Sequence, residues 1–242
     1  MDTSPVVVAV ASSAGDLEAI SELLSALPAE CAAAFVIVQH LGQGREGLLF
    51  ETLSARTTLA VIRAHDGVVA EPRHVYMMTA DTSLTMTGGR TRVTPKPGGL
   101  EHPGDILFTS LAQERGDSAI GVVLSGEGSD GAFGVRAIAQ GGGVTFAQYP
   151  GSARSPSMPI NAIDTRCVRY VLRPNEIARE LARLSEHASV ANSVDERATR
   201  PRGGGPEARV SALSGSSREL HPMGAHGRAA RSASCPENLY CP

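Results

Sequence analysis

The feature that most constrains the fold is a short apolar run followed by a helical pattern, an alternation that recurs along the chain. Residues Pro5–Val10 are continuously apolar and rich in β-branched side chains, which is typical of a strand buried on both faces. Residues Asp16–Leu27 follow, with apolar side chains spaced as on one face of a helix. Because helices that alternate with fully buried strands cover both faces of a sheet, we expect an α/β fold. Its sheet is expected to be doubly wound and mostly parallel.

The remaining expected elements continue this order up to about residue 187. Further strands are expected at Ala33–His40, Leu59–Ala64, Ala119–Leu124, Gly143–Gln148 and Cys167–Leu172. Further helices are expected at Gly47–Ala55, Asp105–Arg115, Ala132–Gln140 and Pro174–His187. An antiparallel hairpin at the edge of the sheet is predicted by a Gly-Gly turn and by short strands at His74–Thr79, Ser83–Thr87 and Thr91–Thr94.

Composition separates an ordered domain, residues 1–188, from a tail, residues 189–242. Between Pro201 and Pro242 the only Leu, Ile, Val or Phe residues are Val210, Leu213, Leu220 and Leu239. A segment with so few apolar side chains cannot bury enough area to offset the loss of chain entropy. We therefore expect a disordered tail. A solvated tail is favoured over one whose arginines bind an acidic partner.

Charge and composition exclude several classes of function. The chain has 22 Lys and Arg against 25 Asp and Glu, which argues against binding nucleic acid through phosphate neutralisation. No apolar run approaches the roughly 20 residues that span a bilayer, so we expect no membrane insertion. The four cysteines form no C-x-x-C pair and no metal-ligand spacing, which predicts reduced thiols. With an N-terminus that lacks the basic region of a signal peptide, this predicts a cytoplasmic protein.

Polar side chains follow three of the expected strands, at the point where each strand ends. Ser12 and Ser13 follow the first strand, His40 ends the second, and Asp130 lies in the loop after Ala119–Leu124. Because ligands bind at the carboxyl ends of parallel strands, these side chains are expected at one edge of the sheet. A serine, a histidine and an aspartate are the components of a nucleophilic triad.

Each of these residues also has a structural interpretation, and spacing alone leaves the choice open. Ser13 and Asp130 could cap the helices that follow them, and His40 could be a hydrogen-bonded structural histidine. The turn after the first strand could hold a phosphate or a nucleotide. The G-x-G-x-x-G and G-x-x-x-x-G-K patterns of such sites are absent, which weakens that alternative.

Three segments resemble a known family, the chemotaxis protein-glutamate methylesterases. Residues Val10–Ile20 are similar to that family's G-A-S-[TA]-G-G-x-E-A-[IL] pattern. Ile37–Leu41 contains its V-Q-H motif, and Leu124–Ala132 resembles its L-[ST]-G-x-G-x-D-G-A motif. The resemblance covers roughly residues 5–185, nearly the whole ordered part, and leaves the tail unmatched.

The resemblance implies hydrolysis of glutamate methyl esters on the cytoplasmic helical bundle of chemoreceptors, with release of methanol. Some family members also deamidate receptor glutamines. Carried over by position, Ser13 is the nucleophile, His40 the general base and Asp130 the carboxylate of the triad. The backbone N–H groups of Ala14 and Glu127 take the place of the oxyanion donors. No metal or organic cofactor is implied.

Departures from the family pattern keep a second class of function open. Asp16 replaces a glycine, and Glu127 stands where chemotaxis members commonly carry Met. We expect the Glu127 side chain to point to solvent, because an anion in the site would oppose the oxyanion. The first expected strand begins at Pro5, so we expect a stand-alone domain. Such an enzyme is either constitutively open or controlled by another chain, for which a separate receiver protein and a methyltransferase are the candidates. The alternative is a non-catalytic, esterase-like module that docks on a receptor or a methyltransferase.

Overall fold

A parallel sheet forms the central layer of the computed structural model, which describes residues 5–13, 17–39, 46–96 and 102–199. The sheet has seven strands in the order β3-β4-β2-β1-β7-β8-β9, and every neighbouring pair is parallel. Its strands are β1 (Val7–Ser12), β2 (Ala34–Gln39), β3 (Ala60–Arg63), β4 (His74–Met77), β7 (Ile120–Val123), β8 (Val144–Gln148) and β9 (Tyr170–Leu172). The expected parallel sheet is confirmed.

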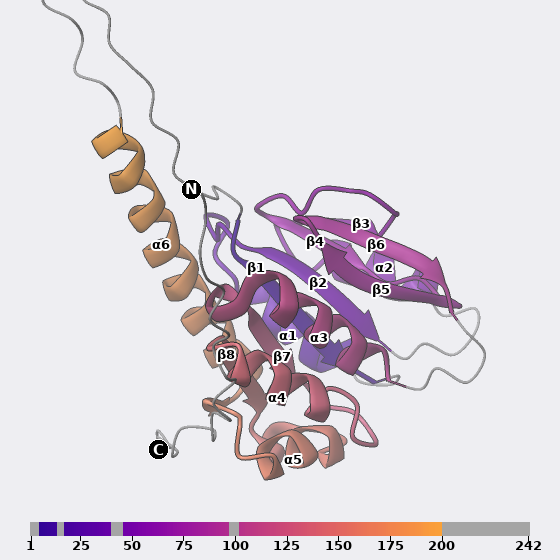
Figure 1. Cartoon of the computed structure of the whole chain (residues 1–242). Coiled ribbons are helices and arrows are strands. Elements are labelled where there is room, and N and C mark those ends of the chain that lie inside the picture. The colour runs from indigo at the N-terminus through magenta and orange to yellow at the C-terminus, as the bar shows by residue number, and fades with distance from the viewer. Residues whose placement is uncertain (1–4, 14–16, 40–45, 97–101, 200–242) are drawn as a thin grey trace, which may run out of the picture.

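Helices cover both faces of this sheet, as predicted (Figure 1). The described helices are α1 (Leu17–Ser25), α2 (Glu46–Ser54), α3 (Pro103–Arg115), α4 (Ala132–Gln140), α5 (Ser157–Asp164) and α6 (Pro174–Thr199). Successive strand side chains point to opposite faces. Accordingly, Ala9 and Ala11 of β1 pack with α3, α4 and α5, whereas Val8 and Val10 pack with α1, α2 and α6. The continuous apolar runs are therefore explained by two cores, one on each face of the sheet.

The antiparallel hairpin is present but is placed differently from the prediction. Strands β5 (Thr82–Thr87) and β6 (Arg90–Pro95) pair with each other in a separate two-stranded sheet. Leu84 and Met86 of β5 join the same core as α3. The hairpin therefore packs against α3 on one face of the main sheet, where its apolar side is buried, and does not extend the sheet's edge. The segment expected to begin this hairpin, His74–Thr79, instead contains β4, a strand inside the parallel sheet.

The last helix is longer than its apolar pattern predicts. The pattern ends near residue 187, but α6 continues to Thr199 (Figure 1). No Pro or Gly interrupts residues 188–199, and a helix usually ends before the residue that precedes a proline, here Pro201. The expected boundary between residues 188 and 189 therefore falls inside α6. The rest of the expected tail, residues 200–242, lies outside the described residues.

Two further sequence expectations can be compared with the structure. Among the described helices, none combines the length and the apolar character that crossing a membrane requires. Cys31 is a buried free thiol, but Cys167 belongs to a disulfide bond. The expectation of reduced thiols is therefore wrong for Cys167. The apolar residues around Cys167 in the sequence do not indicate whether its thiol is bonded.

Candidate active site

Neighbouring parallel strands bring the described polar residues of the predicted site to one edge of the sheet. In the register of the sheet, Ser12 at the end of β1 lies beside Gln39 at the end of β2, and Ala11 lies beside Val123 at the end of β7. Ser13 follows β1 directly, and the loop that contains Glu127 and Asp130 follows β7. Because all three strands run in the same direction, these loops leave the sheet together. Two of the predicted residues, His40 and Ala14, lie outside the described residues.

The two neighbouring serines have different surroundings. The Ser12 side chain is 3% exposed, and its hydroxyl donates a hydrogen bond of 3.1 Å to the Ser125 carbonyl oxygen. Ser13 is partly exposed. Its backbone N–H donates to the same Ser125 carbonyl at 3.4 Å, and its carbonyl accepts a hydrogen bond of 3.3 Å from Gln39 Nε2. The backbone of Ser13 is thus held from both neighbouring strands, and Ser13 is the serine that solvent can reach.

The loop after β7 approaches Ser13 so closely that one position there requires glycine. A Cβ atom on Gly126 would lie 2.7 Å from Ser13 Cβ and 2.2 Å from Met158 Sδ, well below any real contact. Two hydrogen bonds fix the backbone of Gly126. Its N–H donates to the Ser155 carbonyl, just before α5, and its carbonyl accepts the N–H of Met158, in the first turn of α5. Glu127 follows and is exposed, in line with the expectation that its side chain points to solvent.

Asp130 binds the N-terminus of a helix other than the one that it precedes. Its side chain is buried, at 6% exposure. Oδ2 accepts the Gly104 N–H at 2.9 Å and Oδ1 accepts the Asp105 N–H at 3.0 Å, and both donors belong to the first turn of α3. The helix that follows Asp130, α4, has Gly131 at its N-cap position and no side-chain cap. The alternative role of Asp130 as the cap of α4 is therefore wrong. These N–H groups at the start of α3 have no acceptor within the helix, and the Asp130 carboxylate supplies one to each.

Asp105 completes a reciprocal arrangement between α3 and α4. Its Oδ1 accepts the Gly134 N–H of α4 at 2.8 Å, so each helix begins on a carboxylate supplied by the other segment. Burial is the main cause that raises the pKa of the Asp105 carboxyl, and the charge of Asp130 adds to it. The Gly134 N–H and the nearby His102 oppose this rise of the pKa. Two carboxyl groups are thus held close together at this edge of the sheet.

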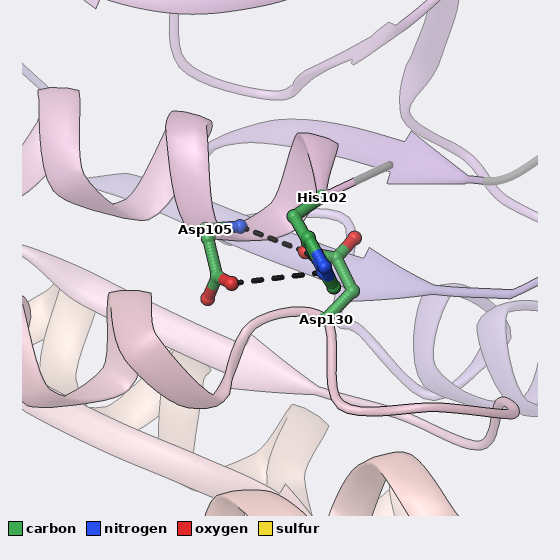
Figure 2. Close-up of side chains that lie close together, drawn as sticks. All are labelled: His102, Asp105 and Asp130. Atoms are coloured by element: carbon green, nitrogen blue, oxygen red, sulfur yellow. Dashed lines mark hydrogen bonds and ion pairs between the residues drawn. The ribbon is translucent and has the colours of Figure 1, made fainter. Parts of the chain in front are cut away.

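His102 is the residue of this cluster that sequence reasoning missed. Its Nδ1 lies 3.9 Å from Asp105 Oδ2 and 3.9 Å from Asp130 Oδ1 (Figure 2). The predicted helix began at Asp105, whereas α3 begins at Pro103, with His102 at the N-cap position. The signal available in the sequence was Pro103, because proline is favoured in the first turn of a helix. It would have moved the predicted start of the helix to Pro103, with His102 at the N-cap position.

The same three side chains have the spacing of a metal site, but their oxygens are already used. One ligand atom each from His102, Asp105 and Asp130 lies within 4.8 Å of the others. Both Asp130 oxygens and Asp105 Oδ1 accept backbone N–H groups. Because the carboxylates serve the starts of α3 and α4, we assign no metal to this cluster.

The sequence and the fold match a known family. Residues 8–181 match the family model described as CheB methylesterase. This chain belongs to the CheB methylesterase family. The solved CheB methylesterase catalytic domain of Thermotoga maritima superimposes with a TM-score of 0.69 at 26% sequence identity, over 75% of this chain and 100% of that domain. The family assignment predicted from the three motifs is confirmed.

Curated relatives of this CheB methylesterase domain carry a double name. The relative from Myxococcus xanthus, named protein-glutamate methylesterase/protein-glutamine glutaminase 3, is 38% identical over 65% of this chain and 44% of its own length. A relative of the same name from Anaeromyxobacter dehalogenans is 35% identical over 73% of this chain and 53% of its own length. A putative member from Leptospira interrogans is 30% identical, and the match covers 92% of its length. The chain thus spans about half the length of the first two relatives.

Proposed function

We propose that this chain is a protein-glutamate methylesterase that hydrolyses glutamate methyl esters on a methylated chemoreceptor-type protein. The observation that carries the proposal is the different placement of the two serines. Ser13 is partly exposed at the carboxyl end of β1, whereas Ser12 is buried and hydrogen-bonded. The buried carboxylate of Asp130, in the loop that touches Ser13 through Gly126, supplies the negative charge that a triad needs.

In the proposed reaction, Ser13 Oγ attacks the ester carbonyl carbon while His40 accepts the hydroxyl proton. The carbonyl oxygen becomes an oxyanion, which the N–H groups of Ala14 and Glu127 stabilise. One such donor contributes roughly 3–4 kcal/mol to the transition state. The bond to the methoxy oxygen breaks, and methanol leaves with the proton from His40. Water then hydrolyses the acyl-Ser13 ester by the same steps, with His40 as base, and releases the glutamate side chain.

The same acyl chemistry extends to a second substrate class. A glutamine side chain presents the same carbonyl group with ammonia as its leaving group, and the curated relatives are named for both activities. We therefore include deamidation of receptor glutamines in the proposal. Because the substrates implied by the family resemblance are cytoplasmic, we place the activity in the cytoplasm. A receiver protein or a methyltransferase is the proposed regulatory partner.

Methanol release from a methylated chemoreceptor tests this function. Ser13→Ala removes the nucleophile and is expected to lower kcat by at least about 10³, because triad members contribute on this scale. Ser12→Ala is the matched control. It removes one hydrogen bond, worth about 1 kcal/mol of stability, and leaves the nucleophile in place. Retained methanol release by a folded Ser13→Ala variant overturns the assignment.

The docking-module alternative is separated from the enzyme by a covalent probe. A fluorophosphonate reacts with an activated serine and with few other hydroxyl groups. The proposal predicts stoichiometric labelling of Ser13, located by peptide mass mapping. A folded chain that binds methylated receptor but remains unlabelled at Ser13 favours the module and overturns the enzyme.

A further inference from the structure

Gln39 binds the backbone of the proposed nucleophile through the nitrogen of its side-chain amide. It ends β2, the neighbour of β1, and lies beside Ser12 in the register of the sheet (Figure 1). Gln39 is buried, at 3% exposure, and its Nε2 donates a hydrogen bond of 3.3 Å to the Ser13 carbonyl oxygen. Because a carbonyl oxygen only accepts hydrogen bonds, the amide nitrogen must be the atom that faces Ser13. This contact therefore fixes the orientation of the amide.

The oxygen of the same amide is buried, and among the residues that the structure describes it has no hydrogen-bond partner. A buried acceptor that gives up water and gains no donor lowers the stability of the fold, and such acceptors are rare in native proteins. The one hydrogen bond that the amide makes is longer than the roughly 2.9–3.0 Å typical of N–H···O bonds. The amide of Gln39 is therefore a poor contributor to stability, and its position beside Ser13 calls for another explanation.

A second buried glutamine at the same edge of the sheet has the bonding of a structural residue. Gln148 ends β8 and is 2% exposed. Its Oε1 accepts the Ser125 N–H at 2.8 Å, and its Nε2 donates to the Ser152 carbonyl at 3.1 Å. Both ends of this amide are thus bonded, and each bond ties a segment outside the sheet to the end of the strand. The amide of Gln39 differs, because its single bond goes to Ser13.

We propose that Gln39 is a positioning residue, whose amide anchors the Ser13 carbonyl and thereby directs the Ser13 hydroxyl toward the substrate. This inference rests on the proposed function. The Ser13 N–H is held at 3.4 Å by the Ser125 carbonyl, in the loop after β7. With the bond from Gln39, both peptide groups of Ser13 are anchored. Because peptide groups are planar, this fixes φ and ψ of Ser13 and with them the direction of its Cα–Cβ bond.

Removing the amide separates its effect on rate from its effect on stability. Methionine is close to glutamine in length and volume but has no amide. In Gln39→Met the unbonded acceptor disappears together with the bond to Ser13, so the fold is expected to keep or gain stability. The Ser13 carbonyl loses one of its two anchors, so the hydroxyl is less often in position to attack and turnover falls. A residue that supports only the fold gives the opposite pattern.

Methanol release and thermal unfolding of full-chain variants test the inference. The variants are Gln39→Met and Gln39→Leu, neither of which has an amide, so that one can replace the other if it fails to fold. The matched control is Gln148→Met, which removes an amide bonded at both ends from the same edge of the sheet. Fluorophosphonate labelling of Ser13 adds a readout that does not depend on binding of the receptor.

We expect Gln39→Met to lower kcat for a methylated chemoreceptor by roughly tenfold to a hundredfold, the scale of a nucleophile displaced by up to about 1 Å. Its KM should stay within about twofold of that of the parent, because the contact is not one with substrate. Labelling of Ser13 should slow together with kcat. The melting temperature of Gln39→Met is expected at or above that of the parent. Gln148→Met is expected to melt lower, because the Ser125 N–H loses its acceptor.

Failure of this inference can be told apart from failure of the proposed function. If the parent releases methanol and the Gln39 variants keep its kcat, the positioning role is wrong and the proposed function stands. The same conclusion follows if Gln39→Met loses as much stability as Gln148→Met, or if neither Gln39 variant folds, because the amide is then structural. If the parent releases no methanol and its Ser13 is unlabelled, the proposed function fails and this inference fails with it.

Discussion

Ser12 and Ser13 are adjacent and chemically alike, and their surroundings separate them. Both follow the first strand, so spacing alone predicted a serine at this edge of the sheet without choosing between them. The family resemblance selected Ser13. The structure adds a physical reason to prefer Ser13 over Ser12, because the Ser12 hydroxyl is buried and hydrogen-bonded to the Ser125 carbonyl. Asp130 was equally ambiguous. Its partners in α3 lie 25 and 26 positions away in sequence, beyond the reach of a local pattern.

The raised pKa of Asp105 predicts a pH-dependent stability at the residue scale. Because burial raises this pKa above the ordinary value of 3.8, the folded chain holds the proton more tightly than the unfolded chain. The resulting cost to folding is absent below pH 3.8 and complete above the raised pKa. Asp105→Asn keeps an oxygen acceptor for the Gly134 N–H and never ionises. The stability of the parent relative to this variant should therefore fall as the pH rises through this range.

Urea unfolding of both proteins at a series of pH values measures this difference. The free energies of unfolding are compared at each pH, so that titrations common to both chains cancel. A difference that stays constant with pH would contradict the prediction, as would a parent that gains stability relative to Asp105→Asn as the pH rises.

At the scale of elements, the site depends on how closely the loop after β7 meets the end of β1. That approach is possible because Gly126 has no side chain, and a Cβ atom there would overlap both Ser13 and Met158. The glycines of this loop were visible in the sequence as part of a motif. Their reason was not, because the contact joins residues more than 100 positions apart. The start of α3 was misplaced although Pro103 was visible in the sequence; its partner Asp130, which comes from a distant part of the chain, was not.

Gly126→Ala is expected to damage activity more than folding. The added methyl group must displace Ser13 or Met158, which costs about 1–3 kcal/mol of stability. A displacement of the nucleophile by about 1 Å lowers the rate by roughly a hundredfold. The control is Gly47→Ala in α2, where the added Cβ meets nothing within 4 Å. Melting and methanol release are measured on both variants, and a Gly126→Ala enzyme with the parent's kcat would refute the proposed contact.

At the scale of the whole molecule, the alternation of apolar runs and helical patterns predicted the layers correctly. The placement of the hairpin could not be predicted, because β5 buries its apolar side chains on α3 and not along an edge strand. The helix α5 was also missed, because it is short and contains Pro159. The length of α6 was underestimated because the apolar stripe in the sequence ends near residue 187, whereas the helix continues to Thr199.

The composition of residues 200–242 predicts that trypsin removes them first. We expect their arginines to be accessible, because this segment has few apolar side chains with which to offset the chain entropy of folding. Arg115 and Arg136 lie in helices α3 and α4, which contribute to one of the two cores. We expect a resistant fragment that retains residues 5–186. Cleavage after Arg115 or Arg136 before residues 200–242 are removed, detected by mass spectrometry, would contradict this prediction.

The most direct test of the account is whether Ser13, His40 and Asp130 act as one unit. The measurement is kcat for methanol release from a methylated chemoreceptor by Ser13→Ala, His40→Ala, Asp130→Asn and the triple variant. Because the members of a triad depend on one another, Ser13→Ala and His40→Ala alone should each be about as slow as the triple variant. Asp130→Asn should lose on the order of 10⁴ in kcat. Losses that multiply, with a triple variant far slower than either of those single variants, would mean that the three residues act independently.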